Sequence, residues 1–292
     1  MNPASIDLDI DGHRLCAIRL NPEVQGEPII LIHGITGSIS SWLVNPLPFV
    51  LEQGPCYALS LPGHFPAAFP PGFRQDQLTA EMLARVMAEA IRQTVGERPV
   101  TLLGHSTGGF SALNIAARYP QMARRVVSIS GFALGKWIGA LGFYQWLVRS
   151  GSLGKAVYKA IYRFAGTNTD ILRTTLRIYA ADAKALYANP DMAETVEKAL
   201  PDFRQLDLDA MVHYFSAMPG IDITPLLSQI QCPTLAIAGD LDPTVPVDES
   251  RKIAAAIPGA ELALIRGAGH LPFLERPIEY QAALSGWLNK TR

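Results

Sequence analysis

The sequence contains little cysteine, and that scarcity argues against two classes of protein. Its three cysteines, Cys16, Cys56 and Cys232, are far apart and odd in number, and no CxxC pair occurs. The sequence therefore predicts neither a disulfide framework nor a zinc site. A GxGxxG motif after the first buried run and an HxxxH spacing are also absent. We therefore expect no metal and no dinucleotide or other cofactor.

The sequence also lacks an excess of either charge. It has 25 Lys and Arg residues against 26 Asp and Glu residues, so we expect no nucleic-acid partner. The nearest approach to a long apolar run, residues 138–148, is about half of the roughly 18 residues that a membrane-spanning helix needs. The first residues have neither the charged nor the apolar region of a signal peptide. We therefore expect a cytoplasmic protein without an integral membrane segment.

Apolar residues are plentiful, at 49% of 292 positions, and they alternate between strand-like and helix-like spacing. This is enough for one large α/β domain with an insertion, or for two small domains. Apolar runs predict strands at residues 5–10, 13–20, 28–34, 56–63, 99–106, 124–131, 233–240 and 261–269. Helical spacing predicts helices at residues 77–95, 111–118, 247–257 and 277–290. The alternation predicts an α/β fold, with a mostly parallel twisted sheet of about eight strands and helices on both faces.

Residues 132–228 interrupt this alternation with helix-like segments and no convincing strand. We predict an all-helical cap over this range, inserted into an α/β core formed by residues 1–131 and 229–292. An insertion at this point would lie above the carboxyl edge of the sheet, where ligands bind in open α/β sheets. The cap is therefore expected to form the roof of a pocket.

The stretch GHSTGG at residues 104–109 places Ser106 between glycines. A serine in a glycine-rich turn can be purely structural, and the motif alone is weak. Here a predicted strand precedes Ser106 and a predicted helix follows it, which is the setting of a nucleophile elbow. In such a turn, side chains at Gly104 and Gly108 would clash with neighbouring backbone. The motif therefore predicts a nucleophilic serine whose hydroxyl stands at the carboxyl edge of the sheet.

A serine hydroxyl needs a base, and the base needs an acid to orient it. His270 is the only histidine after the predicted strand at 233–240. Asp240 and Asp242 both follow that strand, and the spacing alone leaves both open as the acid. The chain order of Ser106, an aspartate and His270 is that of one known group of serine hydrolases.

Five motifs across nearly the whole chain carry a family resemblance: HGITGS, LPGH, GHSTGG, GDLDPTVP and GAGH. With them the sequence resembles the α/β-hydrolase fold superfamily, in its capped serine-hydrolase branch. The resemblance implies that Ser106 attacks a substrate carbonyl and that His270 transfers the proton. It favours Asp242 over Asp240 as the acid that holds His270.

The resemblance also implies an oxyanion hole made by the backbone N–H groups of Ile35 and Thr107. His105, next to Ser106, is expected to point away from the site into packing or a hydrogen bond. The candidate pocket residues come from the HGITGS motif and from the insertion. They are His33, Gly34, Trp137, Phe143, Tyr144, Trp146 and His213. The aromatic residues could instead pack the cap onto the core, and His33 could brace its loop.

The apolar start of the insertion predicts a hydrophobic small-molecule substrate. Charge in the insertion is uneven: residues 131–177 hold seven Lys or Arg and one acid, whereas residues 178–225 hold eight acids and three basic residues. A solvated charged face would account for this. Peripheral docking of the aromatic and basic stretch on an anionic membrane surface is the alternative.

Three functions share these motifs. The leading interpretation is a serine hydrolase that cleaves a carboxylic ester or related acyl bond through an acyl-enzyme on Ser106. The second is a hydrolase of carbon–carbon bonds that uses the same triad. The third is a ligand-binding receptor or assembly factor with vestigial hydrolase activity.

Overall fold

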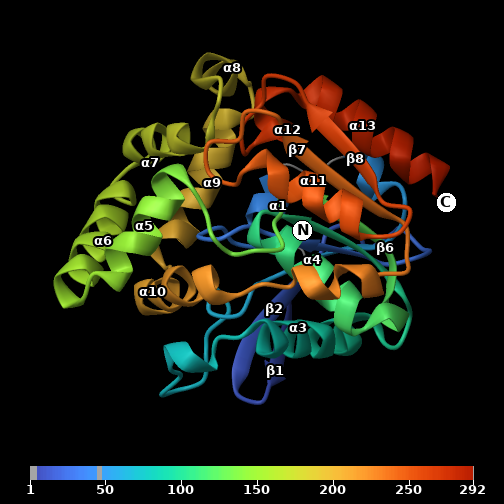
Figure 1. Ribbon diagram of the computed structural model, residues 1–292, viewed down its shortest axis with the longest axis horizontal. Helices are drawn as coiled ribbons and strands as arrows, with labels where there is room; N and C mark the ends of the chain where they lie inside the picture. The colour runs from blue at the N-terminus through green and yellow to red at the C-terminus, as the bar shows by residue number, and fades with distance from the viewer. Residues whose placement is uncertain (1–4, 45–47, 292) are drawn as a thin grey trace.

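The computed structural model describes residues 5–44 and 48–291 of the chain. Within them eight strands form one sheet in the order β1-β2-β4-β3-β5-β6-β7-β8. The pairs β1–β2 and β2–β4 are antiparallel, and all other neighbours are parallel. The strands are β1 (Ser5–Ile10), β2 (His13–Arg19), β3 (Ile29–Ile32), β4 (Cys56–Leu59), β5 (Val100–His105), β6 (Ala123–Ile129), β7 (Thr234–Gly239) and β8 (Glu261–Ile265). The predicted mostly parallel α/β sheet is confirmed (Figure 1).

Helices pack on both faces of the sheet, so the side chains on both faces of its central strands are apolar and buried. All four residues of β3 are buried. Ile30 and Ile32 face a core shared with α3 (Ala80–Val95), α4 (Thr107–Arg118) and α11 (Val247–Ala256). Ile29 and Leu31 face a second core shared with α13 (Pro277–Lys290). A strand buried on both faces reads as a continuous apolar run, which is why these strands are visible in the sequence.

Local signals set the ends of several elements. Asp11 and Gly12 both have positive φ, at 52° and 81°, as the tight turn between β1 and β2 requires. The helix predicted over 77–95 begins only at Ala80, because the Thr79 side chain accepts a hydrogen bond from the N–H of Met82 and caps it. It ends before Gly96, as expected. Short helices that the sequence did not predict are α1 (Ser41–Val44), α2 (Pro48–Leu51) and α12 (Pro272–Glu275).

Between β6 and β7 the chain is helical, and the structure describes every residue there. The helices are α5 (Gly139–Arg149), α6 (Ser152–Ala165), α7 (Thr169–Thr175), α8 (Ala183–Ala188), α9 (Met192–Arg204) and α10 (Leu208–Ala217), with 3-10 turns that include η3 (Leu176–Tyr179). They lie to one side of the sheet, on the left of Figure 1. The division into a core and a cap at residues 132 and 228 stays a prediction.

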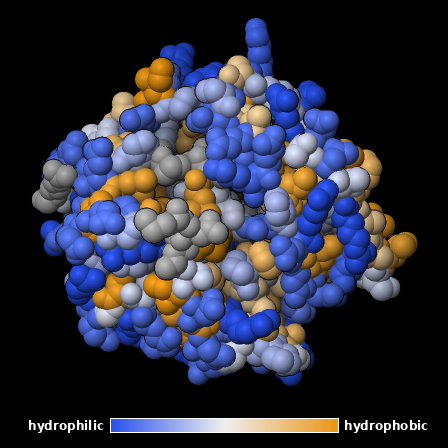
Figure 2. Space-filling view, turned by 180° about the vertical axis from the view of Figure 1, so that it is seen from behind, coloured by the Kyte–Doolittle hydropathy of each residue, from blue (hydrophilic) through white to orange (hydrophobic). Residues whose placement is uncertain are grey.

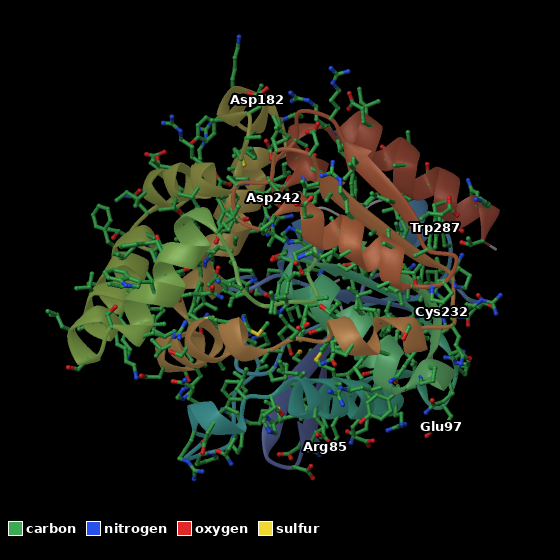
Figure 3. The ribbon with its side chains drawn as sticks, in the orientation of Figure 1. Arg85, Glu97, Asp182, Cys232, Asp242 and Trp287 are labelled. Atoms are coloured by element: carbon green, nitrogen blue, oxygen red, sulfur yellow. The ribbon has the colours of Figure 1, made fainter. Side chains whose placement is uncertain are left out.

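The carboxyl ends of the parallel strands point toward these helices. In Figure 3, Cys232 lies just before β7 on the right, and Asp242 lies just after it, on the side of α5 to α9. Residues that follow β5, β7 and β8 therefore meet near the helices. No helix in the described ranges has the length and hydropathy that crossing a lipid bilayer requires.

Candidate active site

Ser106 occupies a strained turn between β5 and α4. Its φ is 55° and its ψ is −116°, a combination that non-glycine residues rarely adopt. Its N–H donates to the carbonyl of Ile129, and its own carbonyl accepts from Phe110 in the first turn of α4. The neighbouring strand and the following helix thus hold the turn in place, and the side chain faces a cavity.

The glycines of this motif have the steric role that the sequence predicts. A Cβ atom at Gly104 would lie 2.1 Å from the carbonyl oxygen of Gly108. A Cβ atom at Gly108 would lie 2.1 Å from the carbonyl oxygen of Ile32. Both separations are far inside van der Waals contact. The backbones of β3, β5 and α4 can approach this closely only because both positions lack side chains.

His270 and Asp242 form a buried hydrogen-bonded pair at the ends of β8 and β7. The Nδ1–H of His270 donates to Oδ2 of Asp242 over 2.6 Å, and both side chains are almost fully buried. The other carboxylate oxygen accepts from the N–H of Thr244 at 2.8 Å, its hydroxyl at 2.9 Å, and the N–H of Val245 at 2.9 Å. These contacts fix the imidazole so that Nε2 is the nitrogen left for Ser106.

The pKa of Asp242 is set by opposing effects. Burial acts to raise it, but attraction to His270 and the hydrogen bonds from His270, Val245 and Thr244 together lower it below its ordinary value. The carboxylate is therefore kept ionised beside the imidazole. Asp240, the alternative acid, instead accepts the N–H of Gly267 at 2.7 Å. The structure thus brings Asp242, not Asp240, to His270.

Gly34 and Ile35 lie beside Ser106. A Cβ atom at Gly34 would stand 3.1 Å from the Cβ of Ser106, so this loop packs against the elbow. Ile35 lines the same cavity as Ser106. Thr107 is the first residue of α4, and the first N–H groups of a helix have no acceptor within it. Both candidate oxyanion residues therefore lie near Ser106.

Two other histidines support these loops. The Nδ1–H of His33 donates to the carbonyl of Gly34 at 2.8 Å, and its Nε2 accepts from the N–H of Leu61 at 3.1 Å. His105 donates from Nε2 to the carbonyl of His270 at 3.0 Å. Burial lowers the pKa of His33 to about 4 and that of His105 to about 3, so both rings are neutral near pH 7.

An apolar cavity of about 210 Å³ opens onto Ser106 and His270. Of the candidate pocket residues, His33, Gly34 and Tyr144 line it. The described residues that line it include no Asp, Glu, Lys or Arg. Its walls are thus suited to an uncharged, hydrophobic group.

Four candidate pocket residues lie elsewhere, and the expectation is corrected for them. Trp137 is buried between Phe132 and Phe215. Phe143 and Trp146 are 49% and 61% exposed, because the helical repeat of α5 turns Tyr144 inward and these two outward. His213 lies outside the cavity lining.

Other residues form much of the cavity wall instead, most of them from the helices between β6 and β7. Apart from Trp42, they come from α6, α7, η3, α9 and the loop after β8. They include Trp42, Ile161, Leu172, Leu176, Tyr179, Val196, Phe203 and Leu271. Helical apolar spacing in residues 152–204 is the signal that could have identified them as inward-facing. It does not show whether they face a cavity or a packed core.

Comparison with known proteins identifies the family. A family model described as "Alpha/beta hydrolase family" matches residues 29–284. The chain belongs to the α/β hydrolase family. This α/β hydrolase is an enzyme, since its relatives carry esterase and hydrolase names.

Three matches illustrate how similar the relatives are. The pimeloyl-(acyl-carrier protein) methyl ester esterase of Xanthomonas oryzae pv. oryzae is 29% identical over 266 residues, covering 89% of this chain and 94% of that protein. The 2-hydroxy-6-oxo-6-phenylhexa-2,4-dienoate hydrolase of Burkholderia cepacia is 26% identical, covering 87% and 84%. The enol-lactonase of Burkholderia xenovorans LB400 superposes with a TM-score of 0.75 at 18% identity, covering 97% and 100%, which is a likeness of fold.

Proposed function

We propose that this α/β hydrolase cleaves a carboxylic ester or related acyl bond of a hydrophobic small molecule, through an acyl-enzyme on Ser106. The observation that carries the proposal is that His270, held by the buried Asp242, lines the same apolar cavity as the strained Ser106. In this proposal residues 132–228 act as the cap that roofs the cavity.

The proposed reaction proceeds in two halves. In the first, Nε2 of His270 takes the proton of Ser106 as the hydroxyl oxygen attacks the ester carbonyl. Asp242 stabilises the imidazolium, and the N–H groups of Ile35 and Thr107 stabilise the oxyanion. His270 then protonates the departing alcohol, which leaves an acyl-enzyme. In the second half, water repeats these steps and releases the acid.

The cavity wall supports an uncharged acyl group of modest size. A cavity of about 150 Å³ holds one benzene ring in another protein, and this one is about 210 Å³. We therefore expect an acyl group of about one ring or a medium-length chain. Of p-nitrophenyl acetate, hexanoate, benzoate and palmitate, hexanoate or benzoate should turn over fastest. Fastest turnover of acetate would contradict a hydrophobic acyl pocket.

The same wall disfavours the alternative of carbon–carbon bond cleavage. The relative from Burkholderia cepacia is named for a dienoate, which carries a carboxylate. No Lys or Arg side chain lines the described part of the cavity here, so such a group would be buried without a permanently charged counter-ion.

A fluorophosphonate probe and an ester assay test the proposal together. The wild type should label and turn over ester, and Ser106→Ala should do neither. Asp242→Asn should lower kcat by about 10⁴-fold, as loss of the orienting acid does in other triads. Asp240→Asn is the matched control, because its amide oxygen can still accept from Gly267. A wild type that binds hydrophobic ligands without labelling or turnover would favour a receptor and contradict the proposal.

A further inference from the structure

The helices α5 and α6 carry an apolar surface that no part of the described chain covers. Six of the nine large apolar side chains that are exposed in the described residues lie between positions 138 and 164. Among them Leu153 is 76% exposed, Phe164 65% and Trp146 61%. Monomeric proteins seldom concentrate exposed apolar side chains in this way unless the patch binds something.

The apolar surface is continuous along each helix. Leu153, Val157 and Phe164 share one face of α6, since they are separated by four and seven residues. The small exposed residues Ala156 and Ala160 lie between them. On α5 the rings of Phe143 and Trp146 are 5.7 Å apart. We call this set, with Ile138, the α5–α6 face.

This face lies at the edge of the molecule. In Figure 1, α6 is the outermost element on the left. In the reversed view of Figure 2 the same edge is on the right, where orange and tan side chains reach the surface. The opposite side of α6 is fully engaged, with Tyr158 and Tyr162 in the core. The exposed residues therefore do not serve the packing of the helix.

The charged residues on the segment that carries the α5–α6 face are all of one sign. Residues 131–169 hold five basic residues and no acid. Lys159 pairs with Asp209 on the neighbouring α10. Lys136, Arg149, Lys155 and Arg163 have no acidic partner among the described residues.

We propose that the α5–α6 face docks on the surface of an anionic lipid bilayer. The apolar side chains would enter the interface, and the unpaired basic side chains would meet the headgroups, as in interfacial amphipathic helices. A second copy of this chain fits less well. In a two-fold dimer the face would meet itself, and its unpaired positive charges would then oppose one another.

Docking would place the lipid next to the substrate cavity. Ile161 and Ala165 line the cavity from α6, so this single helix separates the cavity from the exposed face. A hydrophobic ester dissolved in the bilayer would then have only one helix to pass. This consequence rests on the proposed function, whereas the docking itself does not.

Sedimentation with vesicles tests the docking. The wild type should pellet with vesicles of phosphatidylglycerol and phosphatidylcholine, and much less with phosphatidylcholine alone or at high salt. Arg149→Gln with Lys155→Gln should weaken binding by about thirtyfold. Trp146→Ser with Phe164→Ser should weaken it at least about tenfold.

Matched controls separate docking from misfolding. Ile278→Ser removes an exposed apolar side chain on α13, and Arg251→Gln removes an exposed charge on α11. Both should bind vesicles like the wild type. All variants should keep the wild-type melting temperature and turnover of a soluble ester.

Two outcomes would overturn the inference. One is no binding to anionic vesicles at low salt, or an equal loss in the control variants. The other is concentration-dependent self-association that Trp146→Ser with Phe164→Ser abolishes, which would assign the face to a second copy. Vesicle binding without any ester turnover would contradict the proposed function alone.

Discussion

Ser106 can hold its unusual backbone angles because its surroundings leave the turn no room to relax. Such a conformation costs about 1–3 kcal/mol, and it persists here because Gly104 and Gly108 let three backbone segments close around it. The strain has a functional use in the proposed mechanism, since it presents the hydroxyl to the cavity that His270 also lines. The turn therefore requires glycine at positions 104 and 108, just as the proposed reaction requires serine at position 106.

Alanine at two glycines should act in opposite directions. Gly108→Ala places a Cβ atom 2.1 Å from a carbonyl oxygen, so we expect a loss of about 1–3 kcal/mol in the free energy of unfolding and a loss of fluorophosphonate labelling. Gly286→Ala, on α13, has no atom within 4 Å of the new methyl and should stabilise the helix by about 1 kcal/mol. Urea denaturation measures both. An unchanged stability in Gly108→Ala would show that the elbow can relax.

Two carboxylates, one buried and one half-buried, join the loops of the site to the helices between β6 and β7. Glu275 of α12 accepts the N–H groups of Ala181 and Asp182 before α8 and of Gly269 beside His270, all within 3.0 Å. Asp202 of α9 accepts hydrogen bonds from the hydroxyls of Ser38 and Ser40. The helices between β6 and β7 are therefore held to the loop after β8 that carries His270, here called the histidine loop, and to the loop that follows Ile35.

Removal of the Glu275 carboxylate should loosen the histidine loop. Glu275→Ala leaves three N–H groups without their acceptor, at about 1–3 kcal/mol for each that stays unsatisfied. We expect a lower free energy of unfolding and a lower kcat/KM. Glu279→Ala, at an exposed position on α13, is the matched control and should change neither. Equal effects of the two substitutions would argue against this bridging role.

Across the whole molecule, several histidines are buried in neutral form. Burial lowers the pKa of His33 to about 4 and of His105 to about 3, and lowers that of His64 as well. In the unfolded chain each would bind a proton near its ordinary value of about 6.5. The unfolded state therefore binds more protons than the folded state between these values. Stability should be complete above about pH 6.5 and fall as the pH drops below it.

The expected size of this loss is about 1.4 kcal/mol per pH unit for each such histidine. Urea denaturation at several pH values between about 7.5 and 5.5 measures the slope. His64→Gln should reduce the slope by one histidine's contribution. His213→Gln, at a half-buried position, should reduce it less. A slope that does not change in His64→Gln would mean that this histidine is protonated in the folded state.

Much of the fold and part of the site could be predicted from local sequence. Strands such as β3 are apolar on both faces. In GHSTGG, the serine and the glycines that its tight turn requires lie within six consecutive residues. The pocket could not be predicted in the same way. Tyr144 and its neighbours Phe143 and Trp146 are all aromatic, and only the rotation of α5 against the core decides which of them faces the cavity. Glu275 meets partners more than 90 positions away, a pairing that no local pattern encodes.

The carbonyl of Tyr179 in η3 accepts a hydrogen bond from the N–H of His270 at 2.8 Å. This bond links the position of η3 to the position of His270. Tyr179 also lines the cavity, so the wall of the cavity and the backbone of His270 cannot shift independently. In the proposed mechanism, a displacement of η3 that admits substrate would loosen His270 at the same moment, so substrate entry and hydrolysis would alternate.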